Sequence, residues 1–357
     1  MRVAADQAQQ WVDSASELLA SNIPTGPIAH VYASRRAMAC EFAVQYHQAD
    51  EQLEEAVLAA FDVIEQVEDR LTIYREHSEV IDLNQRAAAE PVPVDQGLFK
   101  LLKLGEHLHA ETDGAFDMTS GPLSQVWGFL KREGRVPSDE ELAEALWRVD
   151  STSVQLDDAE LSVQFRDEGT EINFNSTGKG FALDLVARQL DEQGHTDYLW
   201  HGGGSSLLAR GRNRSSQREC WSVGLKHPHD SKRRLAEFHL ANRALATAGG
   251  ATQFFEADGQ RYSHIIDPRT GWPATGIYTA TVLAPSAALA DGLATAFFVM
   301  DIEAVEAYCQ QHPEIGAVLV CPSSENRASE SRVAENKGFL VRAFGMTDQD
   351  WQCEQPA

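Results

Sequence analysis

Apolar residues recur every three or four positions across residues 53–71, and acidic residues fill the positions between them. This spacing places the apolar side chains on one face of an α-helix, so the sequence predicts a long amphipathic helix here. A capping signal, Ser138-Asp139-Glu140-Glu141, predicts the start of another helix. Helices are expected in all at about 53–71, 95–111, 138–148, 181–193, 286–299 and 302–312.

Short apolar runs between turn residues predict a larger number of strands. A strand pair is expected around 39–45, and further strands at 153–157, 160–166, 171–175, 198–200, 220–225, 235–240, 244–247, 261–266, 276–284, 316–321 and 338–344. The polar stretch 322–337 predicts a mobile loop. Residues 1–22 predict a short acidic helix that either docks on the body or binds a partner. Strands and helices without regular alternation predict the α+β class, in one body of two interleaved subdomains.

Composition excludes several classes of protein. The chain of 357 residues is 43% hydrophobic and 24% charged, as is usual for a globular protein. No apolar run reaches the roughly 18–20 residues of a membrane span, and no secretory signal is recognisable, so a cytoplasmic protein is expected. The net charge of −24 argues against nucleic acid or a membrane as partner. Five scattered cysteines without a C-x-x-C pair argue against a disulfide framework or a zinc site.

Two segments combine turn residues with reactive side chains. His264 stands on an apolar segment that leads into Asp267-Pro268-Arg269-Thr270-Gly271, a stiff turn that could hold a reactive imidazole, although such a histidine could equally be a core residue. Gly178-Lys179-Gly180 opens a helix after an expected strand, which suits a phosphate, although a flexible connector has the same pattern. It is not a P-loop, because Asn173 stands in place of the first glycine.

Two further patterns point to ligand contacts. Asp291 and Thr295 are one turn apart on a predicted helix, and their oxygens would suit Mg²⁺ or Ca²⁺, whereas the alternative is a helix cap and a core threonine. The segment His201-Gly202-Gly203-Gly204-Ser205-Ser206 contains an H-G-G-G run that could form an oxyanion hole, but the G-x-S-x-G elbow of such hydrolases is missing. A tight glycine turn approached by a ligand is therefore the better interpretation.

Taken in chain order, these segments resemble the ApbE family of FAD:protein FMN transferases over about residues 31–346. The resemblance implies an ApbE-like domain at 29–347, with an acidic helical extension at 1–28 and a tail at 348–357. The motifs that carry it are Met38-Ala39-Cys40, Leu71-Thr72-Ile73-Tyr74, Ser78 to Asn84, Thr112 to Asp117, Gly121-Pro122-Leu123, Trp127-Gly128-Phe129, Gly178-Lys179-Gly180 with Asp184, Gly203-Gly204, Ala246-Thr247-Ala248-Gly249, His264 to Gly271 and Asp291 to Thr295.

The resemblance implies a reaction in which a threonine hydroxyl of an acceptor protein attacks the FMN phosphorus of FAD and AMP leaves. It implies Mg²⁺, with Ca²⁺ or Mn²⁺ as alternatives, held by Asp291, Thr295 and the carbonyl of Gly178. Lys179 would lie near the phosphates, and His264 would act as base or orient a phosphate. The flavin nucleotide would be bound by these two residues together with Met38, Tyr74, Asn84, Asp117, Gly203, Gly204 and Thr247.

Four of the family's motifs are altered here: Ala39 and Cys40 replace a glycine and a threonine, Gly178 replaces an alanine, and Ser205 and Ala248 are the other two changes. Ser205 replaces a carboxylate and Ala248 replaces a hydroxyl residue. These departures favour two alternatives to the transferase. One is a non-catalytic relative that only binds FAD, and the other is a hydrolase that converts FAD to free FMN and AMP.

Overall fold

The protein is described by a computed structural model that covers residues 30–47, 51–214, 216, 218–228, 230–250, 253–323, 334–336 and 338–354. The helix predicted at 1–22, and with it the extension at 1–28, lies outside the described residues. No helix in these ranges is both long and apolar enough to cross a membrane.

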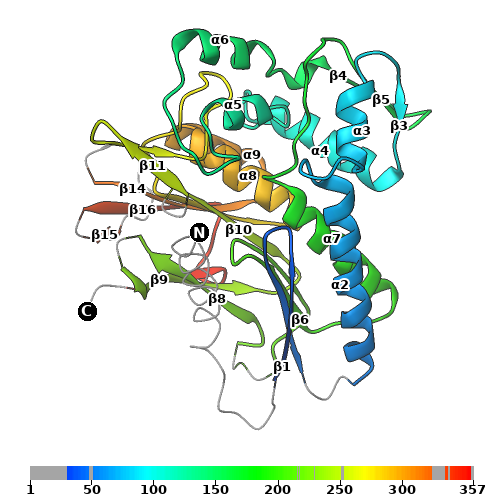
Figure 1. Cartoon of the computed structure of the whole chain (residues 1–357). Coiled ribbons are helices and arrows are strands. Elements are labelled where there is room, and N and C mark those ends of the chain that lie inside the picture. The colour runs from blue at the N-terminus through cyan, green and yellow to red at the C-terminus, as the bar shows by residue number, and fades with distance from the viewer. Residues whose placement is uncertain are drawn as a thin grey trace, which may run out of the picture.

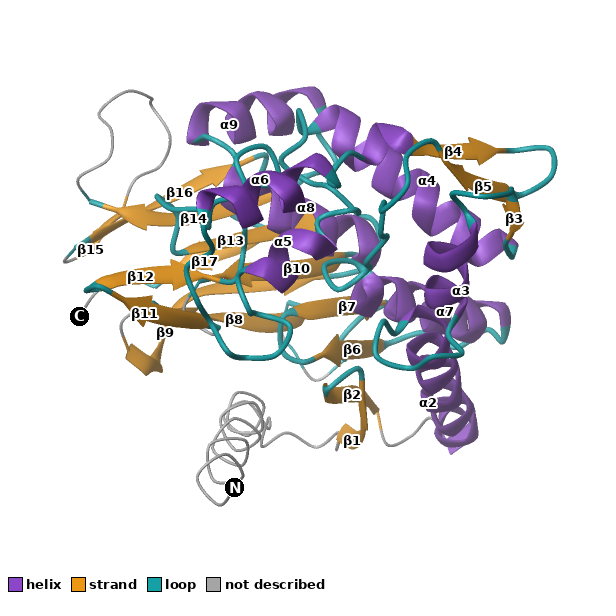
Figure 2. Cartoon of the chain, turned by 45° about the horizontal axis from the view of Figure 1, so that its top comes forward, coloured by secondary structure: helices purple, strands orange, loops and turns teal. Residues whose placement is uncertain are grey.

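A nine-stranded sheet forms the centre of the molecule (Figures 1 and 2). All of its neighbouring strands in the described chain pair antiparallel. Their order is β1 (His30–Ala37), β2 (Cys40–His47), β6 (Tyr198–Gly202), β7 (Ser206–Arg210), β10 (Ala244–Gly249), β13 (Thr279–Ala284), β14 (Gly316–Pro322), β16 (Phe339–Phe344) and β15 (Ala334–Asn336).

The two faces of this sheet are covered differently. Side chains such as Trp200 and Leu208 belong to the core beneath the helices α2 (Glu51–Leu71), α7 (Gly178–Glu192) and α8 (Ala287–Val299). Their strand neighbours Leu199 and Leu207 pack against a three-stranded sheet of β8 (Trp221–His227), β9 (Asp230–Leu240) and β17 (Trp351–Cys353). This alternation follows from the two-residue repeat of a strand that is buried on both faces.

A second subdomain lies beyond α8, at the top of Figure 1. It is formed by parts of the chain that are far apart in sequence, which confirms the α+β class with interleaved subdomains. Its elements are α3 (Glu79–Arg86), β3 (Val92–Pro93), α4 (Gln96–Glu111), α5 (Gly121–Val126), α6 (Asp139–Trp147), η1 (Ser151–Ser153), β4 (Val154–Asp157), β5 (Ser162–Phe165), β11 (Phe254–Ala257) and β12 (Gln260–Ser263). The remaining helix, α9 (Ile302–Gln311), packs beside β14 and β16 of the nine-stranded sheet.

The long helices form as predicted, and the capping box at Ser138 is present. The strand expected at 171–175 is wrong, because this segment takes its hydrogen bonds from the Asn84 side chain and the Met118 carbonyl instead of a neighbouring strand. The strand expected at 261–266 ends at Ser263. In the predicted loop at 322–337, residues 334–336 form β15 instead. Two short helices, α3 and α5, were not predicted.

Candidate active site

One cavity of about 530 Å³ gathers most of the residues that the motifs single out. It lies where the first turn of α7 and the middle of α8 meet the β1–β2 turn, the end of β10 and the segment after β12. Nine predicted residues line it: Met38, Tyr74, Asp117, Gly178, Lys179, Thr247, His264, Asp291 and Thr295. Asn84 lines an adjoining cavity of about 880 Å³, which shares Tyr74 with the first. Gly203 and Gly204 line neither of these two cavities.

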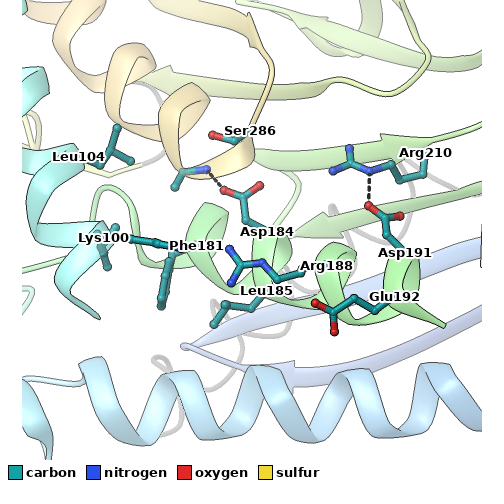
Figure 3. A pocket seen from close by; sticks show the side chains of 12 residues that line it. Lys100, Leu104, Phe181, Asp184, Leu185, Arg188, Asp191, Glu192, Arg210 and Ser286 are labelled. Carbon is teal, nitrogen blue, oxygen red and sulfur yellow. Dashed lines mark hydrogen bonds and ion pairs between the residues drawn. The ribbon is translucent and has the colours of Figure 1, made fainter. Parts of the chain in front are cut away.

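The N-terminal ends of α7 and α8 are held together because each helix supplies, from its second turn, a carboxylate that bonds to the first turn of the other. Asp184 of α7 accepts hydrogen bonds from the backbone N–H groups of Ala287 and Ala288, at 2.7 and 2.9 Å, as Figure 3 shows for one of them. Asp291 of α8 accepts one from the N–H of Gly180 at 2.7 Å. Helix N-termini carry partial positive charge and free N–H groups, so each carboxylate stabilises the neighbouring helix.

Gly180 allows the two helices to approach this closely. A Cβ atom at this position would lie 2.2 Å from the carbonyl oxygen of Ala287, which is backbone and cannot give way. The sequence interpretation assigned this glycine to ligand approach. The structure shows that it serves helix–helix approach, and thereby fixes the position of Asp291 relative to Lys179.

Asp291 is one of two buried acids that line the cavity, with 6% of its surface exposed. Oδ2 is bonded to Gly180, and Oδ1 accepts a hydrogen bond from the hydroxyl of Ser206 at 2.6 Å. Burial raises its pKa, while Lys179 and the two hydrogen bonds act in the opposite direction. The alternative that Asp291 caps its helix is wrong, because the N-cap of α8 is Ser286.

The oxygens around Asp291 fit a hard divalent cation. Thr295 donates its hydroxyl hydrogen to the carbonyl of Asp291 at 3.1 Å, which leaves its oxygen lone pairs available. Gly178 lines the same cavity. The described residues contain no cluster of three or more His, Cys, Asp or Glu side chains suited to a metal. One carboxylate, one hydroxyl and one carbonyl would need water or phosphate oxygens as further ligands, as is usual for Mg²⁺.

Lys179 supplies positive charge to this cavity. Its positive charge acts to lower the pKa of Asp291 and the pKa of His264. Among the described residues its amine forms no ion pair with a carboxylate. A lysine in the first turn of α7 that forms no direct ion pair in the described part of the chain is suited to bind phosphate.

His264 lies in a bend just after β12, with its ring fixed at one end. Nδ1 donates a hydrogen bond to the carbonyl of Gln253 at 3.0 Å, because a carbonyl can only accept. Nε2 is therefore the unprotonated nitrogen of the neutral ring. Burial lowers the pKa of His264, and Lys179 lowers it further against the opposing effect of Gln253. The ring is consequently neutral at pH 7 and can accept a proton.

The turn that follows His264 has the predicted form. The N–H of Gly271 bonds to the carbonyl of Asp267 at 2.8 Å, and Gly271 adopts φ 75°, in the left-handed region. The indole nitrogen of Trp127 donates to the carbonyl of Gly271 at 2.8 Å. This buried anchor ties the turn to the second subdomain.

Asp117 lines the cavity but is occupied by protein donors. Thr119, Ser151 and His109 all bond to its carboxylate, the last through Nδ1 at 3.1 Å. Burial disfavours its charged form, but these hydrogen bonds outweigh burial and lower its pKa. The bond to Asp117 raises the pKa of His109 although burial opposes it. Asp117 and His109 therefore form an ion pair that braces one wall of the cavity.

We expect His109→Gln to destabilise the protein most in weakly acidic solution. The His109 pKa is raised, so its stabilising contribution is complete below about 6.5 and is lost as pH rises through the folded value. The Asp117 pKa is lowered, so the stability that its charged form contributes is lost only in more strongly acidic solution. Denaturant unfolding should show a loss of roughly 1–2 kcal/mol at pH 5.5 that shrinks towards pH 9.

The exposed His107 on the same helix provides the control for this experiment. His107→Gln should change the free energy of unfolding by less than about 0.5 kcal/mol at either pH. A destabilisation by His109→Gln that grows from pH 5.5 to pH 9 would contradict the ion pair.

The remaining predicted residues differ in how directly they could touch a ligand. Tyr74 is 68% exposed at the junction of the two cavities, where its ring is free to stack. The side-chain amide of Asn84 bonds to both the N–H and the carbonyl of Ile172, so it supports the wall. Gly203 and Gly204 turn β6 into β7 with φ 62° and 70°, as a tight glycine turn requires.

Another cavity, of about 660 Å³, shares no lining residue with the site (Figure 3). It lies between α4, α7 and the start of α8. Asp184 is bonded to α8, and Asp191 is bonded to Arg210 and Tyr198. Three basic side chains, Lys100, Arg188 and Arg210, also line this cavity, and their positive charge makes it a poorer cation site than the one around Asp291.

Two residues of the site were missed from the sequence. Ser206 was overlooked because it bonds to a residue 85 positions away, and no local pattern reports such a contact. His109 belongs to none of the motifs that pointed to the site. Its true partner, Asp117, lies eight residues further along, beyond the end of α4.

Comparison with known proteins relates this geometry to a family. Residues 38–319 match the model of the ApbE family. The FAD:protein FMN transferase of Treponema pallidum is 31% identical over 303 residues, which are 81% of this chain and 83% of the relative. The FAD:protein FMN transferase of Vibrio cholerae is 35% identical over 245 residues, which are 68% of this chain and 72% of the relative.

Solved structures agree with the sequence relatives. The crystal structure of the ApbE protein of Thermotoga maritima matches with a TM-score of 0.75 and 28% identity, covering 84% of this chain and 97% of that one. The flavin transferase ApbE of Vibrio cholerae matches with a TM-score of 0.75 and 28% identity, covering 89% of this chain and 98% of that one.

Proposed function

The chain belongs to the ApbE family, and we propose that it transfers FMN from FAD to a threonine hydroxyl of an acceptor protein, with Mg²⁺ bound at Asp291. The observation that carries this proposal is the convergence of Gly178, Lys179, His264, Asp291 and Thr295 on one cavity. They come from three separate parts of the chain, and together they offer hard oxygen ligands, a lysine ammonium group and a neutral imidazole.

The bond changes follow from the substrates. A bond forms between the threonine oxygen and the FMN phosphorus, and the bond from that phosphorus to the bridging oxygen breaks. AMP leaves with that oxygen, and the hydroxyl proton must be accepted by a base. Charge on the phosphates rises during the transfer, so neutralising groups at the phosphates accelerate it.

Each residue has a distinct part in this reaction. Asp291, Thr295 and the Gly178 carbonyl would hold Mg²⁺, which supplies charge neutralisation at the pyrophosphate when bound. Lys179 binds a phosphate oxygen directly. His264 accepts the hydroxyl proton at Nε2, because Nδ1 is bonded to Gln253. Tyr74 stacks on a ring of the nucleotide at the mouth of the cavity.

The departures from the family's motifs leave these groups in place. Cys40 is a protonated thiol at pH 7, because burial raises its pKa to about 11, so it does not compete as a nucleophile. Ala39 adopts φ 57° in the β1–β2 turn, at a cost on the order of 1 kcal/mol relative to glycine. Ser205 and Ala248 line the cavity without touching Asp291 through a hydrogen bond.

Metal removal tests the binding half of the proposal. We expect FAD to bind the metal-stripped protein weakly, and Mg²⁺ to tighten binding about tenfold or more, because the cation offsets repulsion between Asp291 and the pyrophosphate. Flavin fluorescence during a titration with FAD measures both affinities. Equal affinity with and without Mg²⁺ would contradict a cation at the pyrophosphate.

Product analysis tests the transfer half. Incubation with FAD, Mg²⁺ and a cell extract should release AMP and leave an equal amount of flavin covalently bound to protein, visible by fluorescence in a denaturing gel. Free FMN with AMP would indicate the hydrolase, and FAD binding without AMP would indicate the non-catalytic relative. The cytoplasmic location that the sequence predicts remains a prediction, and it would place the acceptor protein in the same compartment.

A further inference from the structure

Ser206 is a buried polar residue at a position where the sheet otherwise presents apolar side chains. It begins β7, and its side chain lies on the same face as Leu208, beneath the helices. It is 0% exposed, and its hydroxyl donates to Asp291 Oδ1 at 2.6 Å. A buried hydroxyl costs free energy unless it is bonded, so the contact with Asp291 accounts for a serine at this place.

The backbone holds this hydroxyl at a defined place. Ser206 pairs with Gly202 of β6 on one side and with Ala246 of β10 on the other. A strand paired on both sides moves little, so the hydroxyl is fixed relative to the sheet. Gly180, the other donor to Asp291, belongs to α7. The carboxylate is therefore anchored at both oxygens by two different elements.

We propose that Ser206 is a positioning residue that orients the Asp291 carboxylate for the divalent cation and thereby sets the affinity for that cation. This inference rests on the proposed function. Two donors occupy two of the roughly four lone-pair positions of a carboxylate and fix its rotation about χ2. Asp291 lines the cavity together with Thr295 and Gly178, so its remaining lone pairs are available to a cation bound there. With Gly180 as the only donor, the carboxylate can rotate away.

Metal binding to the FAD-free protein tests this role without turnover. We expect Ser206→Ala to raise the dissociation constant of Mn²⁺, measured by electron paramagnetic resonance, about tenfold or more. Ser206→Cys keeps the volume and a weak donor, and should raise it roughly threefold. In transfer assays, Ser206→Ala should raise the Mg²⁺ concentration for half-maximal rate by the same factor, with the rate at saturating Mg²⁺ within about threefold of the wild type.

Ser153→Ala is the matched control, because Ser153 is equally buried and its hydroxyl bonds to Thr170 at 3.1 Å, outside the site. It should lower the melting temperature without changing Mn²⁺ affinity. If both Ser206 variants bind Mn²⁺ as tightly as the wild type, the positioning role is overturned while the proposed function stands. If the wild type itself binds no Mn²⁺, the metal part of the proposed function fails and Ser206 loses its role with it.

Discussion

Asp291→Asn is expected to reduce the rate of FMN transfer about 1,000-fold, by two effects that add. The charged ligand of the cation is lost. In addition, Gly180 and Ser206 each donate to one carboxylate oxygen. An asparagine can keep the bond from Gly180 to its oxygen, but its amide nitrogen then donates to the Ser206 hydroxyl and offers no lone pair to the cation. AMP release and covalent flavin formation, measured at saturating FAD, report the effect.

Asp191→Asn is the matched control for this variant. Asp191 is also a carboxylate that accepts hydrogen bonds, from Tyr198 and Arg210, but it lines the separate cavity shown in Figure 3. Its replacement should leave the transfer rate within about twofold of the wild type. A transfer rate within tenfold of the wild type for Asp291→Asn, with unchanged Mn²⁺ affinity, would show that the cation is bound elsewhere.

Helices and their faces could be predicted because their signals are local. The apolar spacing at 53–71 identified α2, and the capping signal at Ser138 identified the start of α6. Asp291 and Thr295 were correctly placed one turn apart because the period of a helix determines that relation. Whether two helices meet is not a local property, so the exchange of carboxylates between α7 and α8 could not be predicted.

Errors arose where side chains replace a neighbouring strand. Residues 171–175 have a strand-like composition, but Asn84 satisfies the backbone of Ile172 from 88 positions away. Likewise, apolar residues continue past His264, yet strand β12 ends at Ser263. Beyond it, Ile266 forms an isolated β-bridge with Pro273. The spacing of apolar residues indicates which side chains are buried, and a buried loop can show the same spacing as a buried strand.

The candidate site could be predicted residue by residue only through the family's motifs. Without the family's motifs, the sequence allowed His264 to be either a core residue or a reactive group. Its bond to Gln253 and its place in the cavity with Lys179 come from the tertiary structure. Ser206 ends the glycine-rich segment that begins at His201 but was given no role, and the neighbouring Ser205 drew attention instead because it replaces a carboxylate. The hydroxyl that contacts Asp291 is one residue further along.

His264→Gln is expected to lower the maximal rate roughly 100- to 10,000-fold, the usual contribution of a general base. Glutamine can still donate a hydrogen bond to the Gln253 carbonyl or to a phosphate, but it cannot accept a proton at pH 7. FAD binding should therefore change less than about threefold, since the phosphates are held by Lys179 and the cation. The exposed His107, replaced by glutamine, again provides the control.

The pH dependence decides between the two roles of His264. As a base it must be neutral, so the rate of the wild type should fall in acid as pH passes below the His264 pKa. Burial and Lys179 place that pKa below about 6.5, so the fall should begin in weakly acidic solution and not at neutrality. His264→Gln should abolish this acid limb. If the limb persists in the variant and the rate falls less than tenfold, His264 orients a phosphate and another group accepts the proton.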